Sequence, residues 1–293
     1  MVRAHHDPED GYLPHVRFHR GEVVLAGAGP GDRGLVTLRA LAYLRQADVI
    51  LYDRLTDHSV LRFARKDAER VNAGKGHRTT SEQDWINEQM LDRAQKGRRV
   101  LRWKGGDPYV FGRGWEEKTY LESHGVRVTY VPGVSSITSL PGLAGISVLT
   151  RGVASSLGLF TGEIGHSAHA RHVRLRALAG ASDTLVGVMV VEHLPSIVEK
   201  LLAVRPPSEP AALIERGATP RQRVLRAPLG HLVAVARRHH LQAPAVLVVG
   251  PTAGETAGRP ENGRGRAMSN ARAGRGPGRG SPAARPPKGP SAR

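Results

Sequence analysis

Short apolar segments alternate with helix-patterned segments along most of this 293-residue chain, and that alternation constrains its fold more than any other feature. Residues 22–27 predict a strand, a Gly/Pro loop follows, and residues 35–46 have the apolar spacing of a helix. Further buried strands are expected at residues 48–52 and 99–103. Strands that alternate with helices build a mainly parallel sheet covered by helices. We therefore expect an α/β fold.

The alternation continues to residue 250 in a looser form. Helices are expected at residues 115–123, 194–203 and 229–238, and strands at 126–131, 157–161, 184–191, 211–215, 223–226 and 245–249. Two neighbouring strands with a short break between them favour more antiparallel pairing in the second half. We expect an N-terminal α/β domain at residues 21–150 and a C-terminal α/β domain with a mixed sheet at 151–250, with the boundary near residues 145–156.

Both ends of the chain differ in composition from its body. Residues 251–293 hold nine Gly and seven Pro but no aromatic residue and no Leu, Ile or Val, so they predict a disordered tail. Residues 1–20 predict a shorter disordered arm. The tail carries +7 of the formal charge of +17. Its run at 274–280 is similar to RNA-binding arginine-glycine tails, but a solubilising tail is favoured, and nucleic acid is not the expected partner.

Composition also excludes several classes of protein. The chain has no cysteine, so disulfides and thiolate chemistry are impossible. No stretch reaches the roughly 20 apolar residues of a membrane span, and the N-terminus has no signal-peptide core. We expect a cytoplasmic protein without membrane contact. His166, His169 and His172 have a spacing that could bind metal, but drift around a helix face is favoured, and no metal site is expected.

A first glycine loop, GAGPGD at residues 27–32, lies between the first strand and the first helix. It suggests a dinucleotide site with Asp53 as the ribose ligand. Two features contradict that interpretation. Asp32 stands where the third glycine belongs, and Pro30 removes a backbone N–H where a phosphate needs donors. By itself the loop predicts a tight turn.

Two more loops follow expected strands. In KGGDP at residues 104–108, followed by GRG at 112–114, the glycines permit close approach of a ligand, and Asp107 can accept from a ribose or an ammonium group. A glycine-rich loop with a helix cap is the alternative. In VPGVSS at residues 131–136, capping of the next helix by Ser135 is at least as well supported as ligand binding.

Taken in order, seven motifs resemble the tetrapyrrole methylase superfamily, and most closely its uroporphyrinogen-III C-methyltransferases. The motifs are GAGPGD, YDRL at 52–55, KGGDPYVFGRG followed by Glu116 and Glu117, VPGVSS, TRG at 150–152, IERGATPRQRV and PAVLVVG. The resemblance covers about residues 22–250. It implies two α/β domains with S-adenosylmethionine folded into the cleft between them, which overrules the dinucleotide interpretation. It also implies a homodimer.

The resemblance implies a cofactor site assembled from both domains. By position its members are Pro30, Gly105, Gly106, Asp107, Val110, Ser135, Ser136, Met189, Gly217 and Ala245. Without the resemblance, Met189 is best interpreted as a core residue, because it lies inside the expected strand at 184–191 and methionine commonly fills gaps in cores.

The implied reaction is C-methylation of uroporphyrinogen III at C2 and C7, which gives precorrin-2 for sirohaem and cobalamin. The sulfonium methyl is already activated, so the enzyme must mainly align it with a ring carbon and help remove a proton. The resemblance assigns Asp53 as proton acceptor and Lys75 as proton donor. Arg113 is another candidate for the catalytic group, but it is too basic to act easily as a base and suits a carboxylate clamp.

Planar guanidinium groups fit the acetate and propionate groups that ring such a substrate. The resemblance places Arg54, Arg113 and Arg151 towards the substrate, and Glu116 is a candidate to orient one of them. The basic body of the chain is consistent with a polyanionic substrate.

The sequence departs from the family pattern in several places. The segment GKGHR around Lys75 is one residue shorter than usual, and VMV at 188–190 replaces a motif that ends in glycine. Ser135 and Ser136 replace a Thr-Ala pair, and Trp103 and Trp115 replace smaller residues, so that Trp115 is a candidate to narrow the substrate cleft. Three alternatives therefore stay open: a methylase of a later corrin intermediate, a ribosomal RNA ribose methyltransferase of the same superfamily, and a paralogue that binds tetrapyrrole without turnover.

Overall fold

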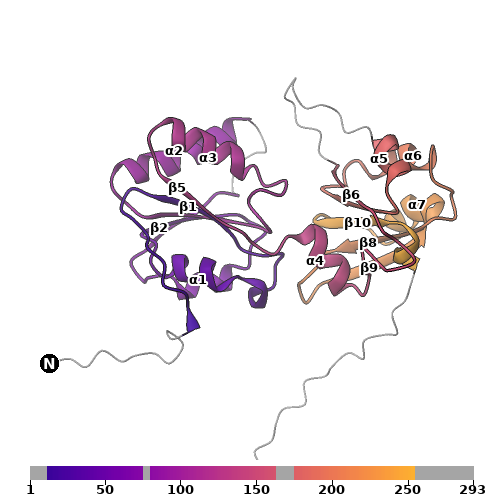
Figure 1. The fold of residues 1–293 in the computed structure, drawn as a ribbon, viewed down its shortest axis with the longest axis horizontal. Coiled ribbons are helices and arrows are strands. Elements are labelled where there is room, and N and C mark those ends of the chain that lie inside the picture. The colour runs from indigo at the N-terminus through magenta and orange to yellow at the C-terminus, as the bar shows by residue number, and fades with distance from the viewer. Residues whose placement is uncertain (1–11, 75–79, 163–174, 255–293) are drawn as a thin grey trace, which may run out of the picture. The chain divides into compact units, whose positions relative to one another are not determined.

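The computed structural model of the chain describes residues 12–74, 80–162 and 175–254, and it contains two five-stranded sheets (Figure 1). All pairs in the first sheet are parallel, and its strand order is β3-β2-β4-β1-β5. Its strands are β1 (Val23–Gly27), β2 (Val49–Tyr52), β3 (Glu69–Asn72), β4 (Val100–Lys104) and β5 (Val128–Val131). Because the strands are parallel, all their carboxyl ends lie at one edge of the sheet.

Helices cover both faces of this sheet. The helix α1 (Leu38–Leu44) packs on one face, and α2 (Thr80–Gln95) and α3 (Gly114–Ser123) cover the other (Figure 1). The alternation of side chains along β1 explains the two cores, because Val24 and Ala26 face α1 while Val23 and Leu25 face α2 and α3.

The second sheet is mixed, with strand order β6-β7-β10-β8-β9. Only β6 and β7 pair in parallel, and the other neighbours are antiparallel. The strands are β6 (Leu157–Thr161), β7 (Thr184–Val188), β8 (Pro210–Glu215), β9 (Arg223–Pro228) and β10 (Ala245–Val249). One face packs on α4 (Ser136–Leu143), and the other packs on α5 (Leu175–Ala181), α6 (Leu194–Leu202) and α7 (Leu232–Arg238). The predicted α/β class, with a parallel sheet followed by a mixed one, is confirmed.

Three local differences from the predicted elements have clear causes. The helix expected at 35–46 is divided into a 3-10 turn (Arg33–Leu35) and α1, because Asp32 caps the first and Thr37 caps the second. The strand β3 was not predicted, since its sequence ERVN lacks an apolar run. Ile137 and Leu140 of α4 pack in the core of the second sheet, so that core begins before the boundary expected at 145–156.

The expected arm and tail each include residues that pack on the body. Phe18 is buried and contacts the Tyr43 ring edge-on at 5.2 Å between centroids. Residues 251–254 form a 3-10 turn (Pro251–Gly254) in which Thr252 and Ala253 are buried. The rest of the expected arm and tail, residues 1–11 and 255–293, lies outside the described residues. No helix in the described part of the chain is long and apolar enough to cross a membrane.

Candidate functional site

The loops that follow β1 and β4 are joined at the carboxyl edge of the first sheet. The backbone N–H of Ala28 donates to the Lys104 carbonyl at 2.7 Å, and that of Gly106 donates to the Gly29 carbonyl at 2.7 Å. The Gly29 N–H returns a bond to the Gly106 carbonyl at 3.3 Å. These bonds bring GAGPGD and KGGDP together, although they lie far apart in the sequence.

The glycines of these loops divide into two kinds. A Cβ on Gly27 or Gly133 would overlap backbone atoms of the neighbouring loops, including the Gly106 carbonyl, so these glycines serve packing between backbones. Gly106 itself has φ +65°, a conformation that favours glycine. At Gly105 no atom lies within 4 Å of the position of a Cβ. Among these residues, Gly105 leaves the backbone open to a ligand.

Asp107 is nearly buried, and its carboxylate holds the loops together. Oδ1 accepts from the Tyr109 N–H at 2.8 Å, and Oδ2 accepts from the Tyr130 hydroxyl at 2.7 Å and from the Gly133 N–H at 3.0 Å. Three donors from the protein therefore occupy the group predicted to accept from a ribose or an ammonium group. Ser135 is the N-cap of α4, and its hydroxyl accepts from the Ile137 N–H at 3.4 Å, which agrees with the predicted cap.

A buried cluster of charges lies directly behind this edge. On β4, the Arg102 guanidinium contacts Asp53 Oδ1 at 2.6 Å and Glu117 Oε1 at 3.2 Å. Lys104 Nζ contacts the same Glu117 oxygen at 2.8 Å. The side chains of Arg102, Lys104 and Glu117 are almost fully buried, and that of Asp53 is 31% exposed. Gln83 on α2 also donates to Glu117 Oε1, at 3.3 Å.

This cluster determines the ionisation of Asp53. Burial alone would raise the pKa of the Asp53 carboxyl, but the charges of Arg102 and Lys104 outweigh burial and hold that pKa below its ordinary value. The pKa of Lys104 is lowered by burial and by the neighbouring Arg102. Asp53 is therefore an ionised, fixed carboxylate at neutral pH. The sequence indicated Asp53 as a candidate site residue but did not indicate its charged partners. Nothing in the sequence of β4, VLRWK, shows that the side chains of Arg102 and Lys104 are buried.

The predicted substrate-facing residues are exposed. Arg113 pairs with Glu116 through Nε at 2.9 Å and Nη2 at 2.8 Å, which is the pairing expected of Glu116. Arg54 and Arg151 are exposed, as is Val110, and Pro30 is partly exposed in the first loop. Lys75 lies outside the described residues, as do His166, His169 and His172.

The remaining predicted cofactor residues lie at one edge of the second sheet. Ala245, the first residue of β10, pairs with Glu215, the last residue of β8, and Val246 pairs with Val188, the last residue of β7. Met189 directly follows β7, and Gly217 lies two residues after the end of β8. The three predicted residues therefore lie near the ends of neighbouring strands. The non-glycine residues Met189, Arg216 and Ala218 have φ of 54°, 47° and 58° here. Such strained backbone is concentrated at ligand sites. The prediction that Met189 is a core residue was wrong: β7 ends at Val188, and Met189 is 42% exposed.

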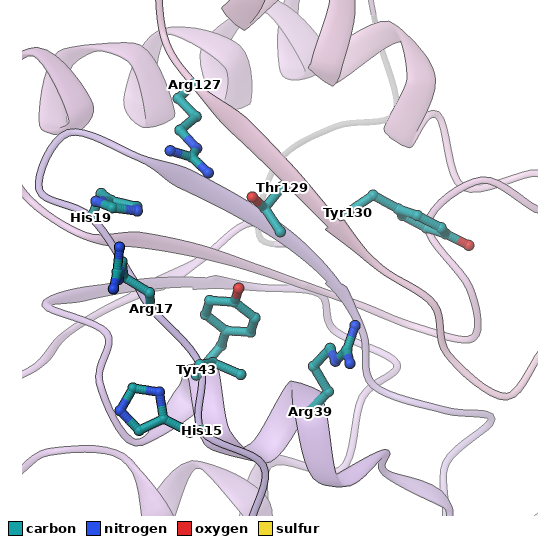
Figure 2. Close-up of a pocket in the computed structure, with 9 residues that line it drawn as sticks. His15, Arg17, His19, Arg39, Tyr43, Arg127, Thr129 and Tyr130 are labelled. Carbon is teal, nitrogen blue, oxygen red and sulfur yellow. The ribbon is translucent and has the colours of Figure 1, made fainter.

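A separate hollow of about 550 Å³ opens beside the edge strand β5 (Figure 2). His15, Arg17 and His19 form one wall because they alternate with Val16 and Phe18, which pack into the core. The other lining residues are Val16, Arg39, Tyr43, Arg127, Thr129 and Tyr130. None of the predicted site residues lines this hollow, so it is distinct from the carboxyl edge.

Comparison with known proteins gives three consistent matches. The family model of tetrapyrrole (corrin/porphyrin) methylases matches residues 22–233. A uroporphyrinogen-III C-methyltransferase of Methanocaldococcus jannaschii is 39% identical, over 78% of this chain and 96% of that protein. A siroheme synthase of Pseudomonas fluorescens is 43% identical over 78% of this chain, and the chain spans about half the length of that relative.

Solved structures agree with these relatives. The uroporphyrin-III C-methyltransferase of Thermus thermophilus, complexed with S-adenyl homocysteine, has a TM-score of 0.68 and 37% identity. The match covers 79% of this chain and 98% of the Thermus chain. A cobalt precorrin-4 methyltransferase has a TM-score of 0.70 at 24% identity, which shows the shared fold alone.

Proposed function

The chain belongs to the tetrapyrrole methylase family, and from that premise we propose that it transfers methyl groups from S-adenosylmethionine to C2 and C7 of uroporphyrinogen III, giving precorrin-2. One observation carries the proposal: the match to the Methanocaldococcus enzyme extends over 96% of that protein, so a complete methyltransferase of this specificity corresponds to the body of the chain. The siroheme synthases support the methyltransferase part only, because the chain spans half their length.

The residues at the carboxyl edge fit the cofactor. Gly105 leaves the space beside its backbone open. Pro30 and Gly106 lie in the two joined loops, and Val110 follows the second of them closely. Ser135 and Ser136 lie just after Gly133, whose N–H donates to Asp107. Met189, Gly217 and Ala245 would complete the site from the second sheet. We assign Asp107 an indirect part, since its carboxylate fixes the loops through three hydrogen bonds. When bound, S-adenosylmethionine supplies an activated methyl group on a positively charged sulfur.

Asp53 carries the acid–base side of the proposal. An ionised carboxylate at the end of β2 accepts a hydrogen bond from a pyrrole N–H and stabilises the positive charge that grows on the ring as its carbon is methylated. It then receives the proton that the ring gives up. Arg102 fixes the carboxylate, and the lowered pKa keeps it ionised. Lys75 remains the proposed proton donor on the family resemblance alone.

The exposed arginines supply binding of the substrate's acidic groups. Arg113 is ordered by Glu116 and presents a planar guanidinium that suits a carboxylate, while Arg54 and Arg151 are exposed cations on other loops. Because its planar guanidinium offers paired N–H donors that match a carboxylate, Arg113 acts in this proposal as a carboxylate clamp and not as a base.

The test is anaerobic incubation with uroporphyrinogen III and isotopically labelled S-adenosylmethionine, followed by mass spectrometry of the oxidised product. We expect a gain of two methyl groups, which Asp53→Ala reduces strongly while S-adenosylhomocysteine still binds. Absence of transfer, with cofactor binding intact, would contradict the proposal and direct the same assay to later corrin intermediates and then to ribosomal RNA.

We also propose a cytoplasmic homodimer, on the family resemblance. Light scattering on the purified chain measures the mass of the assembly, and a mass near twice 31.5 kDa is expected. Cell fractionation tests the location.

A further inference from the structure

Trp115 is an exposed aromatic side chain that stands at the end of a stack of rings. It is 62% exposed, and its ring meets Tyr109 edge-on with centroids 5.6 Å apart. Tyr109 in turn lies flat on Tyr130 of β5, with centroids 3.9 Å apart and an interplanar angle of 4°. The Tyr130 hydroxyl donates to Asp107, so the stack is attached to the loop that carries Gly105. Tyr130 also lines the separate hollow, but Figure 2 shows its ring pointing away from Tyr43 and Arg39 on the other side of that hollow.

The loop before Trp115 is held in an unfavourable backbone conformation. Phe111 has φ 54° and Arg113 has φ 57°, although neither is glycine. Non-glycine residues persist in this region where the surrounding structure enforces it, and they are concentrated at ligand sites. Here Gly112 and Gly114 pack on the backbone of Pro108, which enforces the turn. The same loop exposes apolar surface, since Val110 is 38% and Phe111 44% exposed.

We call Val110, Phe111, Arg113 and Trp115 the aromatic rim. It combines an exposed apolar surface with the side chain of Arg113, which is 49% exposed and whose guanidinium is already oriented by Glu116. Lys118 Nζ lies 5.1 Å from the centre of the Trp115 ring and forms an ion pair with Glu122, so the indole is also held from α3. A cluster of exposed apolar groups around an ordered cation is suited to a ligand with flat rings and acidic substituents.

We propose that Trp115 is a specificity-determining residue that packs against a pyrrole ring of the tetrapyrrole while Arg113 binds one of its carboxylates. This inference rests on the proposed function, and it adds a ring contact to the arginine contacts. The Asp107–Tyr130–Tyr109 stack places the indole at a fixed position relative to the cofactor loop. A truncated side chain at 115 therefore weakens substrate binding and leaves the cofactor site intact.

Steady-state methyl transfer with Trp115→Ala and Trp115→Phe tests this role. We expect Trp115→Ala to raise KM for uroporphyrinogen III about tenfold, with kcat changed less than about twofold, and Trp115→Phe to restore most of the loss. The affinity for S-adenosylhomocysteine, measured by calorimetry, should not change. The matched control is Trp85→Ala on α2, where the indole is 40% exposed. An unchanged KM in Trp115→Ala, an equal rise in Trp85→Ala, or a parallel loss of cofactor affinity would overturn the proposal.

A binding experiment separates this inference from the proposed reaction. Uroporphyrin III, which has rings and carboxylates, and butane-1,2,3,4-tetracarboxylate, which has carboxylates only, are titrated into the wild-type chain and into Trp115→Ala. A loss of affinity for uroporphyrin III alone supports the ring contact, and an equal loss for both ligands contradicts it. If the wild-type chain shows the ring-dependent binding but transfers no methyl group, the proposed reaction fails and the ring contact stands. If the wild-type chain transfers methyl groups and Trp115→Ala binds uroporphyrin III with wild-type affinity, the proposed reaction stands and the ring contact fails.

Discussion

A buried glutamate lies beside each sheet, Glu117 on helix α3 and Glu215 at the end of strand β8, and the two glutamates have different partners. Glu117, behind the carboxyl edge of the first sheet, meets Arg102 and Lys104, whose side chains are 3% and 4% exposed. Glu215, at the end of β8 in the second sheet, meets Arg223 at 2.5 Å, but this arginine is 45% exposed. A buried acid can thus be neutralised from the interior or from the surface. In the first case the cations are shielded from water, and in the second case the cation is partly exposed to it.

The difference also concerns function. The interior cluster extends from Glu117 through Arg102 to Asp53, so it holds the carboxylate that we propose as the proton acceptor. The pair Glu215–Arg223 joins the ends of two adjacent strands, β8 and β9. We therefore expect changes in the first cluster to affect both stability and catalysis, and changes in the second pair to affect stability alone.

The largest effect is expected from Arg102→Met. This change leaves Glu117 and Asp53 without their shared cation in a buried environment, which costs about 3–5 kcal/mol of unfolding free energy. Urea denaturation followed by circular dichroism measures it. The control is Lys66→Met, an exposed lysine of the same half of the chain. A loss under about 1 kcal/mol would show that water reaches the cluster.

A smaller effect separates the two kinds of glycine at the first edge. In Gly133→Ala the new Cβ overlaps the backbone of Gly27 and Gly106, and we expect a loss of about 1–3 kcal/mol in stability. In Gly105→Ala the methyl group has free space, so the melting temperature should stay near that of the wild type. Its affinity for S-adenosylhomocysteine should instead fall about tenfold. Calorimetry of unfolding measures the stability of each variant, and calorimetry of binding measures its affinity for S-adenosylhomocysteine. If the two variants lose the same stability and the same affinity, the glycines do not divide into a packing kind and an open kind.

Arg223→Met tests the partner of the second glutamate. Because Arg223 is almost half exposed and Arg216 Nε remains 3.7 Å from Glu215 Oε1 after the change, we expect a loss of no more than about 1 kcal/mol that shrinks further in 1 M salt. The same urea titration applies, and methyl transfer should be unchanged. A loss as large as that of Arg102→Met would erase the contrast between the two regions.

The smallest effect is a shift in pH dependence. The charges of Arg102 and Lys104 lower the pKa of Asp53. The stability that ionised Asp53 contributes to the folded state is therefore present above the ordinary aspartate pKa and is lost as pH falls through the lowered pKa. Lys104→Met removes one of those charges, so the acid limb of kcat/KM should move to higher pH. Lys96→Met, at an exposed position directly after α2, serves as control. A limb that does not move, or that moves to lower pH, would show that Asp53 is not the titrating group.

Most strands were predictable because their signal is local. The bounds of β6 and β10 match the predicted ranges 157–161 and 245–249, since both are apolar runs between turn residues. The strand β3 was missed because its charged side chains give no period, although it pairs along β2. The interpretation of Met189 as a core residue, made without the family resemblance, failed because an apolar run does not show where a strand stops pairing.

The sequence by itself determined which family the chain belongs to and indicated the loops that we propose as the site, because glycine, proline and strand-end motifs act over a few residues. Tertiary structure alone decided the partner of each side chain. Glu116 and Glu117 are neighbours on one helix, yet the first is exposed beside Arg113 and the second is buried among cations from β4. Likewise only the packed loops show that backbone atoms occupy the space where a Cβ on Gly133 would lie, while the corresponding space at Gly105 is empty. The physical reason is that desolvation and steric overlap depend on atoms that the fold brings together from distant parts of the chain.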